Sequence, residues 1–286
     1  MIYFRKITIL LSLSLIITLP DSLQAAQEKP NIVYIMVDDM GYSDPGCYNP
    51  QSKIPTPNID SLANAGMRFT DAHTTSSVCT PTRYGIVTGR YNWRSTLKKG
   101  VLWGLSEPLV ATDRLTTPKF LQQNGYHTGV VGKWHLGLGW QMLPNGEKRQ
   151  AKTGPTKGYG WQIDYGKKVA GGPLAIGFDE SFIIPASLDM FPYVYLQNDK
   201  PTAWATLTKA FHRPGPCAED FEAINCLRDF AREAGAFIDA RAKELIRSGV
   251  DVINMACGEP DFDAPAAVQA AAVAAVGGGN VRYTPP

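Results

Sequence analysis

Two short strings in this chain combine residue types that could act together on an anion. The string C-x-P-x-R begins at Cys79 and ends at Arg83. The string G-K-W-H-L-G carries Lys133 and His135 two positions apart. A thiol is a nucleophile or a metal ligand once it is deprotonated, and lysine and arginine side chains provide positive charge for an anionic substrate. The two strings therefore indicate a site that binds and attacks an anion.

Pro81 predicts a helix over 81–88 that starts just after Cys79, because proline is favoured in the first helical turn. The N-terminus of a helix presents free N–H groups and a partial positive charge, which suits an anion. Arg83 would lie about one turn from Cys79 and could reach the same position. On the residues alone, a buried and unreactive cysteine that begins an ordinary helix stays an alternative.

Asp38 and Asp39 follow residues 31–37, NIVYIMV, a continuous apolar run that predicts a strand buried on both faces of an α/β sheet. Ligands bind beyond the carboxyl ends of the strands in such sheets. Hard carboxylate oxygens suit calcium or magnesium. A turn or a helix cap is the alternative explanation of an Asp-Asp pair.

Lys133 and His135 are expected to point to one face if their segment is extended, because side chains two apart share a face of a strand. The alternative is a solvated lysine and a histidine packed in a turn. The elements expected around these residues are a helix over 57–65 with Thr56 as its cap, a helix opened by Thr117-Pro118, strands over 127–132 and 178–185, a long surface loop or hairpin excursion over 137–173, and a helical region over 219–247 that is interrupted near Gly235.

Taken together, these strings resemble the core of the type I sulfatases over about residues 30–240. In that family the cysteine is oxidised to formylglycine, an aldehyde whose hydrate attacks sulfate esters. The resemblance implies an arylsulfatase-like sulfuric ester hydrolase whose formylglycine derives from Cys79 through a formylglycine-generating enzyme. It also implies an alkaline-phosphatase-like α/β fold, with a mixed, mostly parallel sheet flanked by helices, of which only part is expected here.

The resemblance also implies roles for single residues. Arg83 would hold the alkoxide of the hydrated aldehyde, Lys133 would neutralise a sulfate oxygen, and His135 would hydrogen-bond the formylglycine hydroxyl. The implied substrate is a sulfated small molecule or glycan, whose identity the substrate-facing loops do not specify. The implied metal is calcium, with the ligands Asp38, Asp39 and the modified Cys79.

The chain departs from the family pattern in its later part. The family's second histidine, second pair of metal ligands and further lysine have no recognisable counterpart, and two aspartates supply only part of the six to eight oxygens that calcium takes. From about Arg241, including residues 258–263 (GEPDFD) and 282–285 (RYTP), the chain instead resembles the N-terminal part of a class I aminotransferase, a family that binds pyridoxal phosphate. A truncated or fused chain without turnover is therefore an alternative, and an aminotransferase fragment is a more remote one.

The N-terminus and composition suggest an exported protein. Residues 1–26 have a basic start, an apolar stretch shorter than the roughly 20 residues that span a bilayer, and small residues at the end, which is typical of a signal peptide. An uncleaved anchor is the alternative. The expected parts are this signal peptide, an N-terminal part of a sulfatase domain over 27–240, and an aminotransferase-like tail over 241–286. The mature protein is expected to be periplasmic or secreted, without membrane contact.

The overall charge and cysteine content add two further expectations. The net charge is +2, and the chain has no run of lysines and arginines, which argues against nucleic-acid binding. The five cysteines are an odd number for an exported chain, and conversion of Cys79 would leave four.

Overall fold

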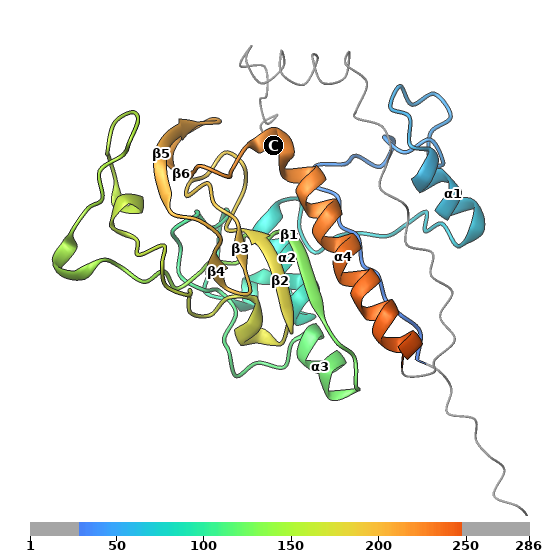
Figure 1. Cartoon of the computed structure of the whole chain (residues 1–286). Helices are drawn as coiled ribbons and strands as arrows, with labels where there is room; N and C mark the ends of the chain where they lie inside the picture. The colour runs from blue at the N-terminus through green and yellow to red at the C-terminus, as the bar shows by residue number, and fades with distance from the viewer. Residues whose placement is uncertain (1–28, 248–286) are drawn as a thin grey trace, which may run out of the picture. The chain divides into compact units, whose positions relative to one another are not determined.

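The computed structural model describes residues 29–247, which form two compact units, residues 29–68 and residues 69–247 (Figure 1). The first unit contains helix α1 (Pro57–Ala65), so the helix predicted for these residues is confirmed. Thr56 occupies the N-cap position, but it does not cap a helix amide as predicted. Its hydroxyl donates to the Asp60 carboxylate over 3.0 Å instead.

The strand predicted for residues 31–37 is not formed. Residues 29–37 have no regular secondary structure, and Ile35 is 73% exposed. A strand needs a neighbour that takes its backbone hydrogen bonds, and none of the strands in the described residues pairs with this segment. Asp38 and Asp39 therefore follow an irregular segment, and the left-handed backbone of Asp39 (φ 57°) turns the chain at this point.

The second unit is built around a mixed sheet whose described strands have the order β1-β2-β3-β4. β1 and β2 are parallel, and they align Lys133 with Ile184 at their carboxyl ends. β3 and β4 continue the sheet in antiparallel fashion. The two predicted strands are confirmed with shifted ends, since Lys133 is the last residue of its strand. The bounds are β1 (Gly129–Lys133), β2 (Glu180–Ile184), β3 (Leu196–Gln197) and β4 (Lys200–Pro201).

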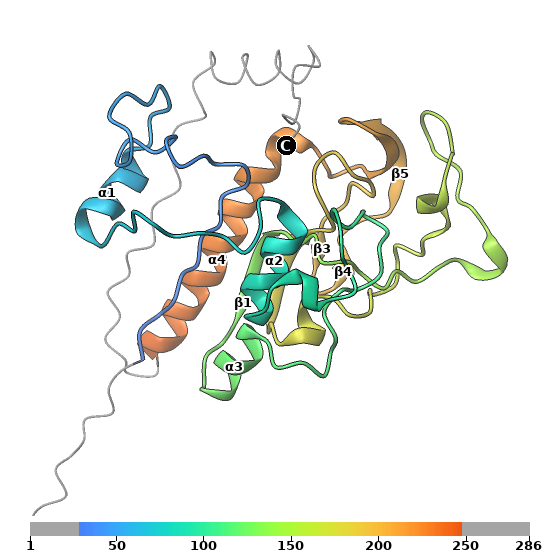
Figure 2. The same ribbon diagram turned by 180° about the vertical axis from the view of Figure 1, so that it is seen from behind.

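Helices flank this sheet on both faces. α2 (Cys79–Thr88) lies behind the sheet in Figure 1 and in front of it in Figure 2, whereas α4 (Cys226–Arg247) crosses the other face. α3 (Thr117–Gln123) precedes β1 in the chain and begins after the N-cap Thr116, whose hydroxyl accepts from the Lys119 amide. The cap is thus one residue earlier than the Thr117-Pro118 pair suggested. The predicted α/β architecture is confirmed.

The remaining elements are short, apart from a two-stranded antiparallel hairpin. β5 (Ala205–Ala210) and β6 (Pro214–Ala218) form this hairpin, which the sequence did not predict. Residues 137–173 are irregular apart from single turns of 3-10 helix, as predicted, but they are not confined to the surface, because Leu138, Trp161 and Ile163 are buried in the core. The described 3-10 turns are Asn92–Arg94, Pro144–Gly146, Tyr159–Gln162, Pro173–Ile176 and Ala223–Asn225.

The buried core of the second unit gathers side chains from α2, the sheet, the long loop and β6. On the α4 face, the Phe230 ring stands edge-on to Phe182 of β2, with centroids 6.2 Å apart. Burial of such large rings is the main favourable contribution to folding. The largest fully buried side chains include Trp161, Tyr84, Tyr193, Phe221, Leu136, Leu138, Ile163, Ile176 and Ile183.

α4 runs without interruption through Gly235, so the predicted break is wrong. The helix is held against the sheet on both sides of this glycine, by Phe230 before it and by Phe237 after it. The Phe237 ring stacks on His127 at 5.7 Å and lies so close to Gly129 that a Cβ there would come within 2.7 Å of it. Tertiary packing therefore outweighs the roughly 1 kcal/mol helix penalty of one glycine.

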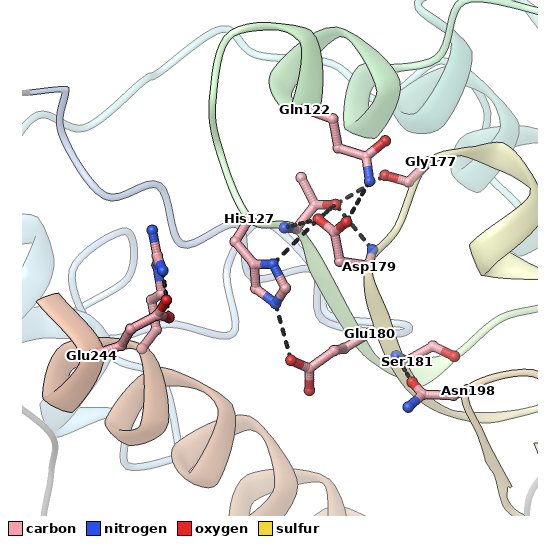
Figure 3. Close-up of polar contacts among 10 residues, drawn as sticks. Gln122, His127, Gly177, Asp179, Glu180, Ser181, Asn198 and Glu244 are labelled. Atoms are coloured by element: carbon pink, nitrogen blue, oxygen red, sulfur yellow. Dashed lines mark hydrogen bonds and ion pairs between the residues drawn. The ribbon is translucent and has the colours of Figure 1, made fainter.

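A polar cluster closes the N-terminal ends of β1 and β2 (Figure 3). His127 lies between the carboxylates of Asp179 and Glu180, 3.5 and 2.9 Å away. Asp179 also accepts from Gln122 of α3 over 2.6 Å and from the Thr128 amide over 2.7 Å. Burial raises the pKa of Asp179, but these hydrogen bonds outweigh it and hold the pKa below its ordinary value. The cluster thus attaches α3 to the N-terminal end of β1, whereas Lys133 lies at the carboxyl end of this strand.

Among residues 29–247, no helix has the length and apolar character needed to cross a bilayer. The predicted signal peptide over 1–26 and most of the predicted aminotransferase-like tail over 241–286 lie outside the described residues.

Candidate functional site

The predicted nucleophile stands at the beginning of a helix. Cys79 is the first residue of α2 and is half-buried. The N-cap residue Val78 is extended and makes no side-chain cap hydrogen bond, so no side chain takes the first amides of the helix in the way a serine or aspartate cap would. The rest of α2 is largely buried, which fixes its direction. This local geometry is what the C-x-P-x-R string predicted.

Arg83 connects α2 to the end of the sheet. Its guanidinium donates from Nη1 to the backbone carbonyl of Lys133. This bond joins residues 50 positions apart in the sequence and brings the first turn of α2 to the carboxyl end of β1. The predicted reach of Arg83 to the side chain of residue 79 stays a prediction, since the bond seen here goes to the main chain.

Lys133 ends β1 with its ammonium group near a hydroxyl that the sequence did not single out. Its Nζ lies 3.4 Å from Oγ of Ser187, in the loop after β2. The lysine is half-buried, so its charge is only partly screened by water. An anion bound between the α2 N-terminus and this loop would therefore meet a positive charge.

His135 is fully buried and has an unusual backbone. Its φ of 56° is left-handed, so the backbone leaves the extended conformation at this residue. That Lys133 and His135 point to one face stays a prediction. Its amide donates to the Pro185 carbonyl over 3.1 Å, and its Nε2 lies 2.7 Å from the Leu102 carbonyl. The tertiary contacts that hold this turn decide where the imidazole goes, and the two-residue spacing alone does not reveal them.

The charge state of His135 follows from its surroundings. Burial lowers its pKa to about 4, the Leu102 carbonyl opposes this, and Lys133 and Arg83 lower the pKa further. The ring is therefore neutral near pH 7 and can donate one hydrogen bond and accept another.

An ion pair beside Ser187 belongs to the same region and was not predicted. Arg213, between β5 and β6, donates to the carboxylate of Asp189. Burial raises the pKa of Asp189, but hydrogen bonds from Arg213 and Ser187 outweigh it and keep the pKa below its ordinary value. The strings that contain these residues, SLDM and HRPGP, are visible in the sequence, but nothing in their spacing reveals that they meet.

The structure thus brings four of the six predicted residues into one region. The α2 N-terminus with Cys79 and Arg83 is bonded to the segment that carries Lys133 and His135, all within the second unit. Asp38 and Asp39 belong to the first unit, and their place beside Cys79 stays a prediction.

The two aspartates fit calcium in the type of donor but not in number. Carboxylate oxygens are the ligands that calcium prefers, and it takes six to eight of them. Within residues 29–247, no group of three or more histidine, cysteine, aspartate or glutamate side chains gathers as a metal site would require.

Known proteins with similar sequences are sulfatases. Residues 30–166 match the family described as Sulfatase. The chain is 41% identical to an N-acetylgalactosamine-6-O-sulfatase of Bacteroides thetaiotaomicron over 171 residues, which is 60% of this chain and 29% of that protein. It is 44% identical to arylsulfatase A of Homo sapiens over 126 residues, 44% of this chain and 24% of that one. The chain thus spans less than a third of the length of these relatives.

Solved structures support the same assignment. One, from work on the metabolism of multiple glycosaminoglycans by Bacteroides thetaiotaomicron, superposes with a TM-score of 0.58 at 29% identity and covers 74% of this chain and 48% of that one. The crystal structure of Ps i-CgsB superposes with a TM-score of 0.52 at 25% identity, over 76% of this chain and 42% of that one. The fold is therefore the alkaline-phosphatase-like fold of sulfatases, present in part. Residues 30–166, which contain the six predicted site residues, are the part of the chain that matches the sulfatase family.

Proposed function

We propose that this chain carries the nucleophile and the anion-binding groups of a sulfuric ester hydrolase, with formylglycine formed from Cys79. The observation that supports this most is the bonding of the α2 N-terminus to the segment with Lys133 and His135. It joins the C-x-P-x-R and G-K-W-H-L-G strings, which are 50 residues apart, in one region that suits an anion. The sulfatase relatives support the same chemistry.

The reaction consumes one water and converts a sulfate monoester to an alcohol and hydrogen sulfate. When present, the hydrated aldehyde supplies an oxygen nucleophile and a second hydroxyl whose proton loss releases sulfate. The chain's own residues would bind and orient the ester. The ammonium of Lys133 and the first amides of α2 offset the negative charge of the sulfuryl oxygens. The neutral ring of His135 can exchange hydrogen bonds with a hydroxyl at residue 79.

The substrate class in this proposal is a sulfated small molecule or glycan. The B. thetaiotaomicron relative is named N-acetylgalactosamine-6-O-sulfatase, and the similar solved structure comes from work on the metabolism of multiple glycosaminoglycans. Calcium held by Asp38, Asp39 and residue 79 is part of the proposal, as are a formylglycine-generating enzyme and export to the periplasm or medium after removal of residues 1–26.

A second candidate function is a non-catalytic sulfatase fragment. It is favoured by the number of predicted calcium ligands, because two aspartates supply only part of the six to eight oxygens that calcium takes. A chain of this kind would bind sulfate or a sulfated ligand at the α2 N-terminus without turnover. We expect weak or absent turnover of the isolated chain for this reason.

Two measurements on the secreted protein test the proposal. Mass spectrometry of the peptide that contains residue 79 shows whether the thiol has become an aldehyde. A chromogenic aryl sulfate assay with added calcium then separates a hydrolase from a fragment. Cys79→Ala should abolish any turnover, and Cys47→Ala, which changes a half-buried cysteine of the first unit, should not. An unmodified Cys79 after co-expression with a formylglycine-generating enzyme would contradict the proposal.

A further inference from the structure

Three hydrogen bonds join Thr80, Leu102 and His135 in a closed ring. The Thr80 hydroxyl donates to the backbone carbonyl of His135 over 3.0 Å, and the Leu102 amide donates to the same hydroxyl over 3.2 Å. Nε2 of His135 lies 2.7 Å from the Leu102 carbonyl and completes the ring. Thr80 and His135 are both fully buried, so water does not compete for these groups.

The ring of bonds decides which nitrogen of His135 carries the hydrogen. A carbonyl oxygen can only accept, so Nε2 must be the donor toward Leu102. In the neutral imidazole that donates from Nε2, Nδ1 holds a lone pair. Nδ1 is buried and has no hydrogen-bond partner among the residues that the structure describes. A buried acceptor in this state is costly and favours a donor that can reach it.

We propose that Thr80 is a positioning residue, which fixes His135 as the Nε2–H tautomer and so reserves Nδ1 to accept a hydrogen bond from a hydroxyl on the side chain of residue 79. In this arrangement Thr80 holds the imidazole indirectly, through its hydrogen bonds to the Leu102 amide and to the His135 carbonyl. It directly follows Cys79 in α2, so one helical turn carries both the nucleophile and the group that orients its partner. The identity of the hydroxyl rests on the proposed function, whereas the tautomer rests on the hydrogen-bond geometry alone.

The tautomer can be measured in the full-length chain with ¹⁵N-labelled histidine. Only four histidines are present, and the signals lost in His135→Gln identify the ring of interest. In a neutral imidazole the protonated and the bare nitrogen have well-separated ¹⁵N shifts. We expect the wild-type ring to be the Nε2–H form. A wild-type ring that carries its hydrogen on Nδ1 would overturn the inference.

Substitutions at Thr80 test its part in this arrangement. Thr80→Val keeps the shape but removes the hydroxyl and should give a mixture of both tautomers, whereas Thr80→Ser should keep the Nε2–H form. The matched control is Thr82→Val, because Thr82 lies in the same helical turn but donates to Ser76, over 2.7 Å. A His135 ring that is entirely in the Nε2–H form in Thr80→Val would overturn the inference. If the valine variant does not fold, Thr80→Ala is used for the same measurement.

The ¹⁵N signals of His135 also test whether Nδ1 accepts a hydrogen bond, and this test does not require the protein to be catalytically active. The chain is co-expressed with a formylglycine-generating enzyme, and intact mass gives the converted fraction of residue 79. Conversion should shift the Nδ1 signal upfield relative to Cys79→Ala, and Thr80→Val should remove that shift. A converted protein with an unshifted Nδ1 would overturn the role. If no variant is converted, the proposed function fails, and the inference is then decided by the tautomer of the wild type and of Thr80→Val.

Discussion

A single guanidinium nitrogen of Arg213 donates to both the carboxylate and the backbone carbonyl of Asp189. The guanidinium also lies 4.8 Å from the ring centroid of Trp103, and the backbone carbonyl of Arg213 accepts from the Tyr193 hydroxyl over 2.6 Å. These contacts join the turn between β5 and β6 to the loop after β2, close to Ser187. The ion pair between Arg213 and Asp189 therefore stabilises the loop that contains Ser187, whose hydroxyl lies near Lys133.

Asp189→Asn should lower the stability of the second unit in a way that depends on pH. The pKa of Asp189 is depressed in the folded protein, so its contribution is present above the unfolded value of about 3.8 and is lost as pH falls through the folded value. The Asp189 and Arg213 side chains are both partly exposed, so we expect the free energy of unfolding to fall by about 1 kcal/mol at pH 7. Thermal unfolding from pH 7 to pH 3 should show wild type and variant converging at low pH. Asp113→Asn, at an exposed acid, is the control, and an equal loss there would contradict the prediction.

Asp199→Asn should have the opposite effect. Burial raises the pKa of Asp199 to about 6, and the Leu174 amide and Lys168 oppose the shift only in part. A carboxyl with a raised folded pKa destabilises the protein progressively as pH rises from about 4 to about 6. Asparagine is neutral, can keep the bond from the Leu174 amide, and tolerates the left-handed backbone found here (φ 64°).

We therefore expect Asp199→Asn to raise the free energy of unfolding by about 1–3 kcal/mol at pH 7 and to have little effect near pH 4. Chemical denaturation at the two pH values measures both quantities. The companion variant Asp189→Asn gives the opposite sign at pH 7 in the same experiment. A destabilised Asp199→Asn protein at pH 7 would show that the charge on this buried carboxylate is needed.

Lys133→Met should weaken the binding of sulfate. Methionine keeps much of the length and apolar volume of lysine but removes the charge that lies beside Ser187. Loss of one charged donor next to an anion should raise the Kd for sulfate about tenfold or more. Isothermal titration calorimetry measures this without requiring turnover. Lys167→Met, at an exposed turn, is the matched control, and equal affinities in the two variants would show that sulfate does not bind at Lys133.

The sequence predicted the local part of the site better than its long-range part. A helix that starts next to Cys79 follows from Pro81, although it begins slightly earlier than predicted, at Cys79 itself. A strand that leads to Lys133 follows from a β-rich run. Such features depend on neighbours in the chain. The left-handed backbone of His135 depends instead on bonds to Pro185 and Leu102, which no spacing along the chain encodes.

The failed predictions have a similar cause. Residues 31–37 have the composition of a buried strand, yet a strand forms only where another strand takes its hydrogen bonds. Gly235 has a low helix propensity, yet the packing of Phe230 and Phe237 on the sheet keeps α4 continuous. In both cases the outcome is decided by contacts with distant segments, which outweigh the preference of single residues.

Phe237→Ala should loosen the C-terminal half of α4 more than it affects the rest of the second unit. The ring is half-buried, stacks on His127 and fills the space over Gly129, where no side chain intervenes. Removal of the ring leaves a gap that Gly129 cannot fill. We expect the free energy of unfolding to fall by about 1–2 kcal/mol, which is less than the loss typical of a fully buried phenylalanine. Hydrogen exchange should show faster exchange of the α4 amides after Gly235, with those near Phe230 less affected.

Leu227→Ala is the matched control for this prediction. It removes a large apolar side chain from the same helix, but Leu227 is 80% exposed and should cost little. Gly129→Ala approaches the same contact from the strand, since the added Cβ would lie 2.7 Å from the Phe237 ring and push it away. Similar exchange patterns in Phe237→Ala and Gly129→Ala would place the attachment of α4 at this contact. Unchanged exchange in both variants would show that Phe230 alone holds the helix to the sheet.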